Sequence, residues 1–85
     1  QLLMYKANIY ITLRKSILDP KGKATLHALH SLEFNSITHA RIGKFIELNV
    51  EAESDEKATE MVDQACQKLM ANLVMEDYRF ELIKL

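Results

Sequence analysis

The stretch YKANIYITLR, residues 5–14, decides the fold class, because apolar and polar side chains alternate along it. A period of two with several β-branched residues predicts a half-buried strand. The apolar face of this strand should be formed by Tyr5, Ala7, Ile9, Ile11 and Leu13. The other face should carry the intervening residues, Tyr10 among them. The chain therefore opens with a strand on which the following elements can pack.

Two helices are expected downstream of this strand. Asp19 can cap the first and Pro20 suits its first turn, so this helix should run to about Leu32. Ser54 can cap the second, which should end near residues 71–72. The first helix has an apolar face made by Ala24, Thr25, Ala28, Leu29 and Leu32. The second has a clearer apolar stripe made by Ala58, Met61, Val62, Ala65 and Leu69.

Three more strands are expected. Residues 37–42 and 45–51 are typical of two strands, and Gly43-Lys44 is the turn signal between them. This arrangement predicts a tight hairpin. Residues 78–83 alternate again and should form the last strand. The order of elements is then β-α-β-β-α-β.

This order predicts an α+β fold, a two-layer sandwich in which both helices cover one face of an antiparallel four-stranded sheet. The open face of the sheet would carry Tyr10 and Phe45. An exposed aromatic face on so small a chain suggests that another protein covers it. We expect a single domain over residues 4–85, because Met4 resembles a native start and residues 1–3 are set aside.

Composition narrows the class of function. The 85 residues hold 11 Lys and Arg against 12 Asp and Glu, a net charge of −1. The basic surplus typical of nucleic-acid binders is therefore absent. Membrane-spanning segments need a long apolar run, which the sequence lacks. Cys66 is the only cysteine, so the chain can form no internal disulfide. We expect a cytoplasmic protein.

The sequence shows no catalytic, cofactor or metal site. Cys66 lies within the second expected helix without a base beside it, which favours a small buried residue. His27 and His30 lie three residues apart on a helix, but a metal site needs further ligands. Arg41 and Lys44 flank a glycine at the expected hairpin tip. These two cations suit either a tight turn with solvent-exposed flanks or a contact with an acidic group of a partner.

Four segments resemble the PurS family, in the family's order and at its length. They are LDPKGKA at 18–24, HALHSL at 27–32, RIGKFIEL at 41–48 and CQKLMAN at 66–72. The resemblance extends over residues 4–83. Glu33 stands where the family pattern has a glycine, and Leu73 where it has a proline. The first departure removes a glycine that would help to end the helix.

The resemblance implies a role in de novo purine biosynthesis. It implies a small, non-catalytic subunit of phosphoribosylformylglycinamidine (FGAM) synthase, a complex that uses glutamine and Mg-ATP. Such a subunit is expected to join the glutaminase PurQ to the synthetase PurL and to assist ammonia transfer between them. It should form a homodimer or homotetramer, and should itself bind no cofactor, metal, nucleic acid or membrane.

Two sets of contact residues are expected on this basis. The partner-facing set is Asp19, Pro20, Gly22, Arg41, Gly43 and Lys44. The candidates for contacts within a homo-oligomer are Tyr10, His27, His30 and Phe45. Turn chemistry alone explains Asp19, Pro20 and Gly22 equally well, as a shaped loop.

The main alternative is a regulatory module of ferredoxin-like type that senses a small metabolite, because such modules share the β-α-β-β-α-β order. Stabilisation by a metabolite without partners would favour it. An RNA-binding sheet is a weaker alternative, since it needs stacking aromatic residues framed by basic ones. A stand-alone enzyme is weaker still, because it needs a nucleophile beside a base.

Overall fold

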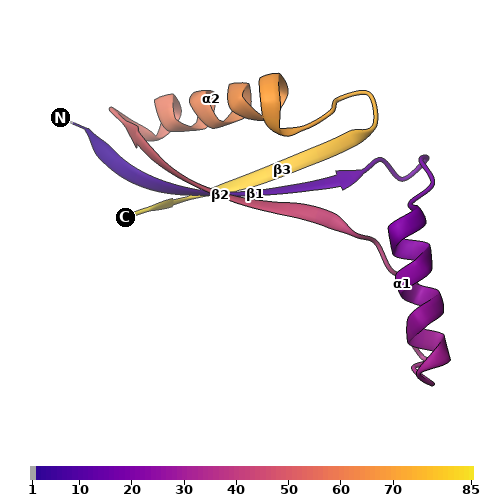
Figure 1. The fold of residues 1–85 in the computed structure, drawn as a ribbon. Coiled ribbons are helices and arrows are strands. Elements are labelled where there is room, and N and C mark those ends of the chain that lie inside the picture. Colours follow the sequence, from indigo (N-terminus) through magenta and orange to yellow (C-terminus); the bar gives the residue numbers. More distant parts are fainter. Residues whose placement is uncertain (1) are drawn as a thin grey trace.

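A computed structural model describes residues 2–85 of the chain. Figure 1 shows a strand-rich body with one helix on it and a second helix that projects away from it. The elements in chain order are β1 Leu3–Leu13, α1 Pro20–Ser31, β2 Gly43–Ala52, α2 Asp55–Ala65, the π-helical turn η1 Cys66–Met70 and β3 Glu76–Lys84. Leu3, which the sequence analysis set aside, already belongs to β1 and lies opposite Ala52.

The sheet is antiparallel, with the order β2-β1-β3. The first strand of the chain therefore lies in the middle. Tyr10 lies opposite Phe45 on β2 and Arg79 on β3. Residues directly opposite in an antiparallel pair share a face, so these three side chains lie together on the face that points away from α2. The predicted α+β class and the alternation along β1 are confirmed.

The core lies between the other face of this sheet and α2. The buried apolar residues are Tyr5, Ala7, Ile9, Ile11, Val50, Ala52, Ala58, Val62, Cys66 and Ala71. Two tyrosine hydroxyls also hold the helix to the sheet. Tyr5 donates a hydrogen bond to Asp55, and Tyr78 donates one of 2.6 Å to Asp63. These bonds link both ends of α2 to β1 and β3.

The π-helical turn η1 changes the face that the end of the second helix presents. Its wider turn is closed by a 2.9 Å hydrogen bond from the N–H of Ala71 to the carbonyl of Cys66. A π-helical turn holds more residues than an α-helical one, so the side chains after it rotate off the apolar stripe. Leu69, within η1, was predicted to belong to that stripe but is 78% exposed. Met61, which precedes the turn, is 51% exposed as well, so the predicted stripe is wrong at both positions.

The predicted hairpin and the strand over residues 37–42 are not formed within residues 2–85. Gly43 is the first residue of β2 instead of a turn, and residues 37–42 have no strand partner. Two of their backbone groups bond to the first helix and its cap instead. The carbonyl of Ile37 lies 2.7 Å from a ring nitrogen of His30, and the N–H of Ile42 donates to Asp19. The sheet therefore has three strands rather than the predicted four.

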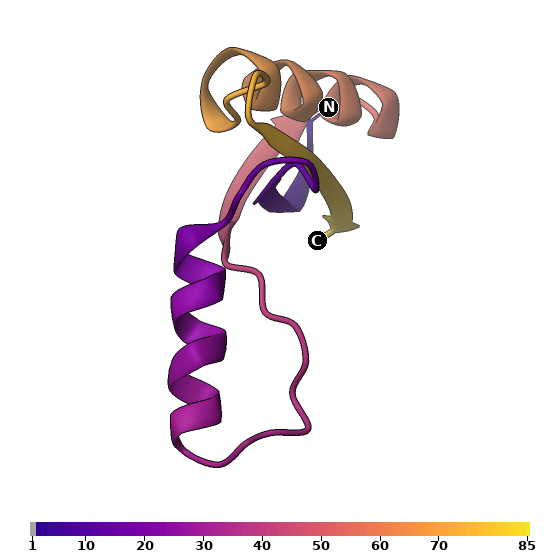
Figure 2. The ribbon, with the colours of Figure 1, turned by 90° about the vertical axis from the view of Figure 1, so that its right-hand side faces the viewer.

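Helix α1 has the predicted bounds but not the predicted position. It projects from one end of the sheet instead of covering a face of it (Figures 1 and 2). The segment that follows α1 runs back along the helix to the same end of the sheet, where β2 begins. The two helices therefore do not share one face of the sheet. We call residues 20–42, which comprise α1 and the returning segment, the arm. Gly22 is the only residue of α1 that is buried.

The arm makes the molecule elongated. Its principal extents are 55 × 27 × 14 Å and its radius of gyration is 16.6 Å, whereas a compact chain of this length has a radius of about 12 Å. The accessible surface is 6332 Å², against about 5,200 Å² for a compact monomer of this mass. The chain alone thus exposes an unusually large surface.

Helix α1 ends in a Schellman motif. The N–H of Phe34 donates to the carbonyl of Leu29, and the N–H of Glu33 donates to that of His30, each at 3.0 Å. The motif needs a left-handed residue after the helix cap, and Glu33 adopts it with φ 72°. This is the position at which the resemblance described above led us to expect a glycine.

Among the described residues, neither helix has the length and apolar character needed to cross a membrane.

Candidate partner-binding site

Asp19 connects the two ends of the arm. Its side chain accepts hydrogen bonds from the N–H of Gly22, at 3.0 Å, and from the N–H of Ile42, at 2.9 Å. The first bond caps α1, as predicted. The second joins the start of α1 to a residue that lies 23 positions later. The N–H groups of Ile42 and Gly22 lower the pKa of the Asp19 carboxyl, because they stabilise its charged form.

Gly22 allows the returning segment to approach α1 closely. A Cβ atom at this position would lie 2.5 Å from the carbonyl oxygen of Ala40 and 2.5 Å from a carboxylate oxygen of Asp19. Both distances are shorter than real Cβ contacts. The glycine is therefore needed for this close approach. Because it is buried and has no side chain, it offers no side-chain contact to a partner.

The second predicted motif fixes the returning segment to the sheet. The guanidinium of Arg41 donates to the carbonyl of Leu13 at the end of β1. Lys44 reaches across to Glu76 on β3, with 3.7 Å between the ammonium and the carboxylate. Gly43 lies between them and pairs with Thr12 of β1. The segment is thus attached to β1 and to β3.

The structure brings the whole predicted partner-facing set together where the arm joins the body. We call this cluster the arm root, and it comprises Asp19, Pro20, Gly22, Arg41, Gly43 and Lys44. A hollow of about 320 Å³ lies beside it, lined by Ile11, Leu13, Asp19, Pro20, Lys21, Ile42, Gly43, Lys44 and Glu76. The contacts described here are internal, so a partner-facing role remains a prediction.

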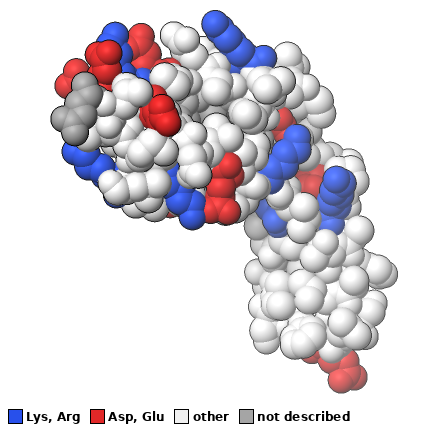
Figure 3. Space-filling model, turned by 60° about the vertical axis from the view of Figure 1, so that its left-hand side comes forward, with Lys and Arg blue, Asp and Glu red and all other residues white. Residues whose placement is uncertain are grey.

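The outer part of the arm, residues 24–40, is almost uncharged. From residue 24 to residue 40, Glu33 is the single Asp, Glu, Lys or Arg residue. Leu32 is 68% exposed and Phe34 is 53% exposed. In Figure 3 the projecting part of the molecule is nearly free of charged residues up to its tip. A surface of this kind is typical of a contact with another chain.

The oligomer candidates fall on two separate surfaces. His27 and His30 are exposed on α1, whereas Tyr10 and Phe45 lie on the open face of the sheet. Their rings are tilted by 40°, with 5.1 Å between centroids. Among residues 2–85, no three His, Cys, Asp or Glu side chains are grouped to hold a metal.

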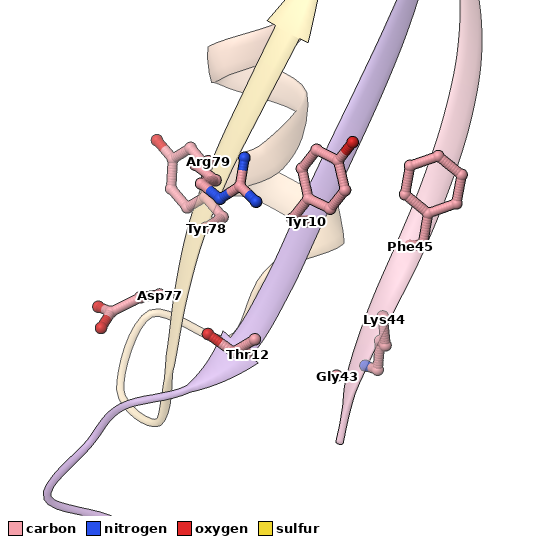
Figure 4. A pocket seen from close by; sticks show the side chains of 8 residues that line it. All are labelled: Tyr10, Thr12, Gly43, Lys44, Phe45, Asp77, Tyr78 and Arg79. Carbon is pink, nitrogen blue, oxygen red and sulfur yellow. The ribbon is translucent and has the colours of Figure 1, made fainter. Parts of the chain in front are cut away.

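Arg79 completes an aromatic cluster on the open face that the sequence analysis missed. Its guanidinium lies 4.1 Å from the centroid of the Tyr10 ring, close enough for a cation–π interaction. Figure 4 shows Arg79, Tyr10 and Phe45 side by side across the three strands. A hollow of about 390 Å³ adjoins them. The alternation along residues 78–83 places Arg79 on this face, so the sequence contained the signal.

The thiol of Cys66 is poorly suited to catalysis. Cys66 is the first residue of η1, and its side chain is fully buried in the core. Burial raises the pKa of the thiol, with a smaller contribution from the charge of Asp63, so the reactive thiolate is disfavoured. This agrees with the expectation of a small buried residue.

The model of the PurS family, described as phosphoribosylformylglycinamidine (FGAM) synthase, matches residues 6–84. The chain belongs to the PurS family. A PurS subunit from Bacillus subtilis is 48% identical over 79 residues, which cover 93% of each chain. A PurS subunit from Methanocaldococcus jannaschii is 39% identical over 82 residues, which cover 96% of this chain and 99% of the relative.

Solved PurS structures agree with the fold. The B. subtilis PurS structure is similar with a TM-score of 0.82 and 46% identity, over 93% of this chain and 98% of that one. A chain of the Thermotoga maritima structure named PurLQS is similar with a TM-score of 0.85 and 36% identity, over 96% of this chain and 98% of that one. These relatives give no support to the alternative of a metabolite-sensing module.

Proposed function

We propose that this chain is the non-catalytic bridging subunit of FGAM synthase, which acts in de novo purine biosynthesis. It joins the glutaminase PurQ to the synthetase PurL. Family membership supports the proposal, as does the similarity to a chain of the T. maritima PurLQS structure. The role places the chain in the cytoplasm, where it forms a homodimer or homotetramer.

The arm is the observation that carries this proposal. It extends the molecule to 55 Å and presents apolar side chains with little charge. The hydrophobic effect favours burial of such a surface against another chain over its exposure to water. The arm root, with its charged Arg41 and Lys44, lies between this surface and the body. The chain thus has a partner surface that extends well beyond its own core.

Bridging explains how a chain without reacting groups can contribute to a reaction. The complex uses glutamine and Mg-ATP, which we assign to the glutaminase and the synthetase, while this chain binds neither. Ammonia must pass between the two sites as neutral NH₃, because ammonium has no lone pair with which to attack. A rigid subunit assists by holding the two sites in register and by excluding water between them.

Reconstitution tests the proposal. The chain is mixed with PurQ and PurL from a close relative, and glutamine-dependent FGAM formation is compared with the ammonia-dependent activity of PurL. We expect the first activity to require the chain and the second to be independent of it. A chain that neither binds PurQ and PurL nor changes either activity would refute bridging.

A matched pair of variants tests the arm. Leu32→Glu places a charge on its uncharged surface, whereas Glu33→Gln changes the adjacent residue without adding one. We expect Leu32→Glu to raise the amount of chain needed for half-maximal glutamine-dependent activity by tenfold or more, on the order of a buried interface contact. Glu33→Gln should leave it unchanged. Equal behaviour of the two variants would show that the arm surface stays free in the complex.

A further inference from the structure

Positive charge is concentrated where the arm joins the body. Six of the 11 Lys and Arg residues lie within residues 14–23 and 41–44, which contain one acidic residue, Asp19. We call these six the basic cluster, and they are Arg14, Lys15, Lys21, Lys23, Arg41 and Lys44. Figure 3 shows Lys and Arg side chains at the place where the projecting part meets the body. The overall charge of −1 therefore conceals a locally basic surface.

Contacts within the chain bring the two segments of the basic cluster together. Arg41 donates to the carbonyl of Leu13, the residue that precedes Arg14. Lys21 comes from the first segment and Lys44 from the second, and both line the hollow of about 320 Å³ beside the arm root. The cluster is thus one surface of the folded chain, although its members lie far apart in the sequence.

Half of the basic cluster has no acidic partner in this chain. Lys44 pairs with Glu76 at 3.7 Å, and Arg14 pairs with Asp77 at 3.6 Å. The members that form no ion pair within residues 2–85 are Lys15, Lys21 and Lys23. All three are exposed, so their charges are available to another molecule.

Two of these free lysines occupy positions that do not favour the helix. Lys21 and Lys23 lie within the first four residues of α1, whose first turn contains no acidic residue. Cations are disfavoured there, because the N-terminus is the positive end of the helix macrodipole. Helix α2 follows the usual preference, with Asp55 and Glu56 in its first turn. A local preference is most often broken at a functional site, which indicates that the two lysines serve binding.

The hollow beside the arm root combines these cations with apolar side chains. Ile11, Leu13 and Ile42 line it together with Lys21 and Lys44. Ile42 is 41% exposed. A ligand that matches this lining carries negative charge beside an apolar group.

A free phosphate or nucleotide does not match it. Asp19 and Glu76 also line the hollow and would repel phosphate. The N–H groups of Gly22 and Ile42 bind the Asp19 carboxylate and keep it charged. A polypeptide avoids this repulsion, because its carboxylates can reach the outer lysines while an apolar side chain enters the hollow.

We propose that the basic cluster docks an acidic segment of one of the two other subunits of FGAM synthase. Carboxylates of that segment pair with Lys15, Lys21 and Lys23, and one of its apolar side chains enters the hollow. The inference rests on the bridging function proposed above and assigns the chemistry of one of its contacts. Complementary charges speed association and fix the orientation of the partner. The nearly uncharged outer part of the arm cannot supply this selectivity.

Charge reversal tests the inference on the full chain, with surface plasmon resonance against PurL and against PurQ from a close relative. The double variant Lys21→Glu, Lys23→Glu should bind one of the two subunits about tenfold more weakly at low salt. Its affinity for the other subunit should be unchanged. At about 1 M salt, where the Debye length is about 3 Å, the variant and the unaltered chain should bind within twofold of each other. Acidic residues suit a helix N-terminus, so the variant should fold, which circular dichroism checks.

Two control variants separate position from net charge. Lys57→Glu combined with Lys68→Glu makes the same change of net charge on α2 and η1 and should keep both affinities. Lys21→Arg combined with Lys23→Arg keeps the charges of the cluster and should also keep both. If the first control lost affinity as the reversed variant does, the effect would belong to net charge and the inference would be overturned.

The remaining contrary outcomes identify other occupants. The inference is overturned if the unaltered chain binds a subunit and the reversed variant keeps both affinities, or if both affinities fall alike. It is overturned if the reversed variant changes the mass of the chain alone by light scattering, since a second copy, with six acidic residues in 51–63, would then be the occupant. It is overturned if the unaltered chain alone binds ATP and the variant does not. An unaltered chain that binds neither subunit would refute bridging itself, and the inference with it.

Discussion

Glu33 holds a backbone conformation that suits glycine, so Glu33→Gly should stabilise the arm. The residue has φ 72° in the Schellman motif that ends α1. For a residue with a Cβ atom, this left-handed conformation costs about 1–2 kcal/mol. Glycine avoids that cost but loses about 0.5–1 kcal/mol more conformational entropy on folding. The net expectation is a gain of about 0.7 kcal/mol.

Hydrogen exchange is the assay that reports on the arm itself. The N–H groups of Glu33 and Phe34 close the motif. Their exchange should slow by about threefold in Glu33→Gly if they open locally, which is the factor that 0.7 kcal/mol represents at 25 °C. Protein concentration must be the same throughout, because association adds to apparent stability.

Glu33→Ala is the matched control for the same assay. Alanine removes the carboxylate but keeps the Cβ atom, and therefore keeps the cost of the positive φ. Its exchange should remain within a factor of two of the unaltered chain. If alanine slowed exchange as much as glycine does, the effect would come from the lost charge and the reasoning from backbone conformation would be refuted.

Three further predictions concern the arm root and the core. The lowered pKa of Asp19 means that its bonds stabilise the arm above the unfolded-state pKa and are lost as pH falls through the folded one. The protection of the Gly22 and Ile42 amides, taken relative to their intrinsic exchange rates at each pH, should therefore fall in acid, and Asp19→Asn should remove this dependence. The bond to Asp55 raises the pKa of Tyr5 to about 12, so its stabilisation should hold below pH 10 and be lost towards pH 12. Urea unfolding should show a larger loss in the unaltered chain than in Tyr5→Phe, in which Tyr10 and Tyr78, whose pKa values are raised as well, still titrate. Gly22→Ala should open the arm root, because the new Cβ would lie 2.5 Å from a carbonyl oxygen. This change should lower glutamine-dependent activity but leave ammonia-dependent activity unchanged, and an equal loss of both activities would contradict the prediction.

Local signals in the sequence predicted the elements more reliably than their placement. The alternation along β1 and the cap at Asp19 depend on neighbouring residues, and both predictions are confirmed. The position of α1 depends on what covers its apolar face. Periodicity shows that the helix face formed by Ala24, Ala28 and Leu32 is apolar enough to be buried. It does not show whether this chain or another one buries that face. The predicted two-layer sandwich is therefore more compact than the structure, in which α1 lies off the sheet.

The missing strand has a related cause. Residues 37–42 have suitable side chains, but a strand also needs a neighbour for its backbone groups. Here the neighbour is α1, through His30 and Asp19. The bond from Ile42 to Asp19 spans 23 positions, and no local pattern predicts it. The two partner-facing motifs were therefore found separately, but their meeting at the arm root was not foreseen.

The pairing of Thr12 with Gly43 has a consequence for how this chain can change. The pairing of β1 with β2 ends at Thr12 and Gly43, and the arm lies in the chain between these two residues, so it is topologically an insertion between two neighbouring strands. Its length and sequence can vary without shifting the register of β1 against β2. A designer could exchange the arm as a cassette between homologues, and thereby transplant partner choice while the sheet stays intact.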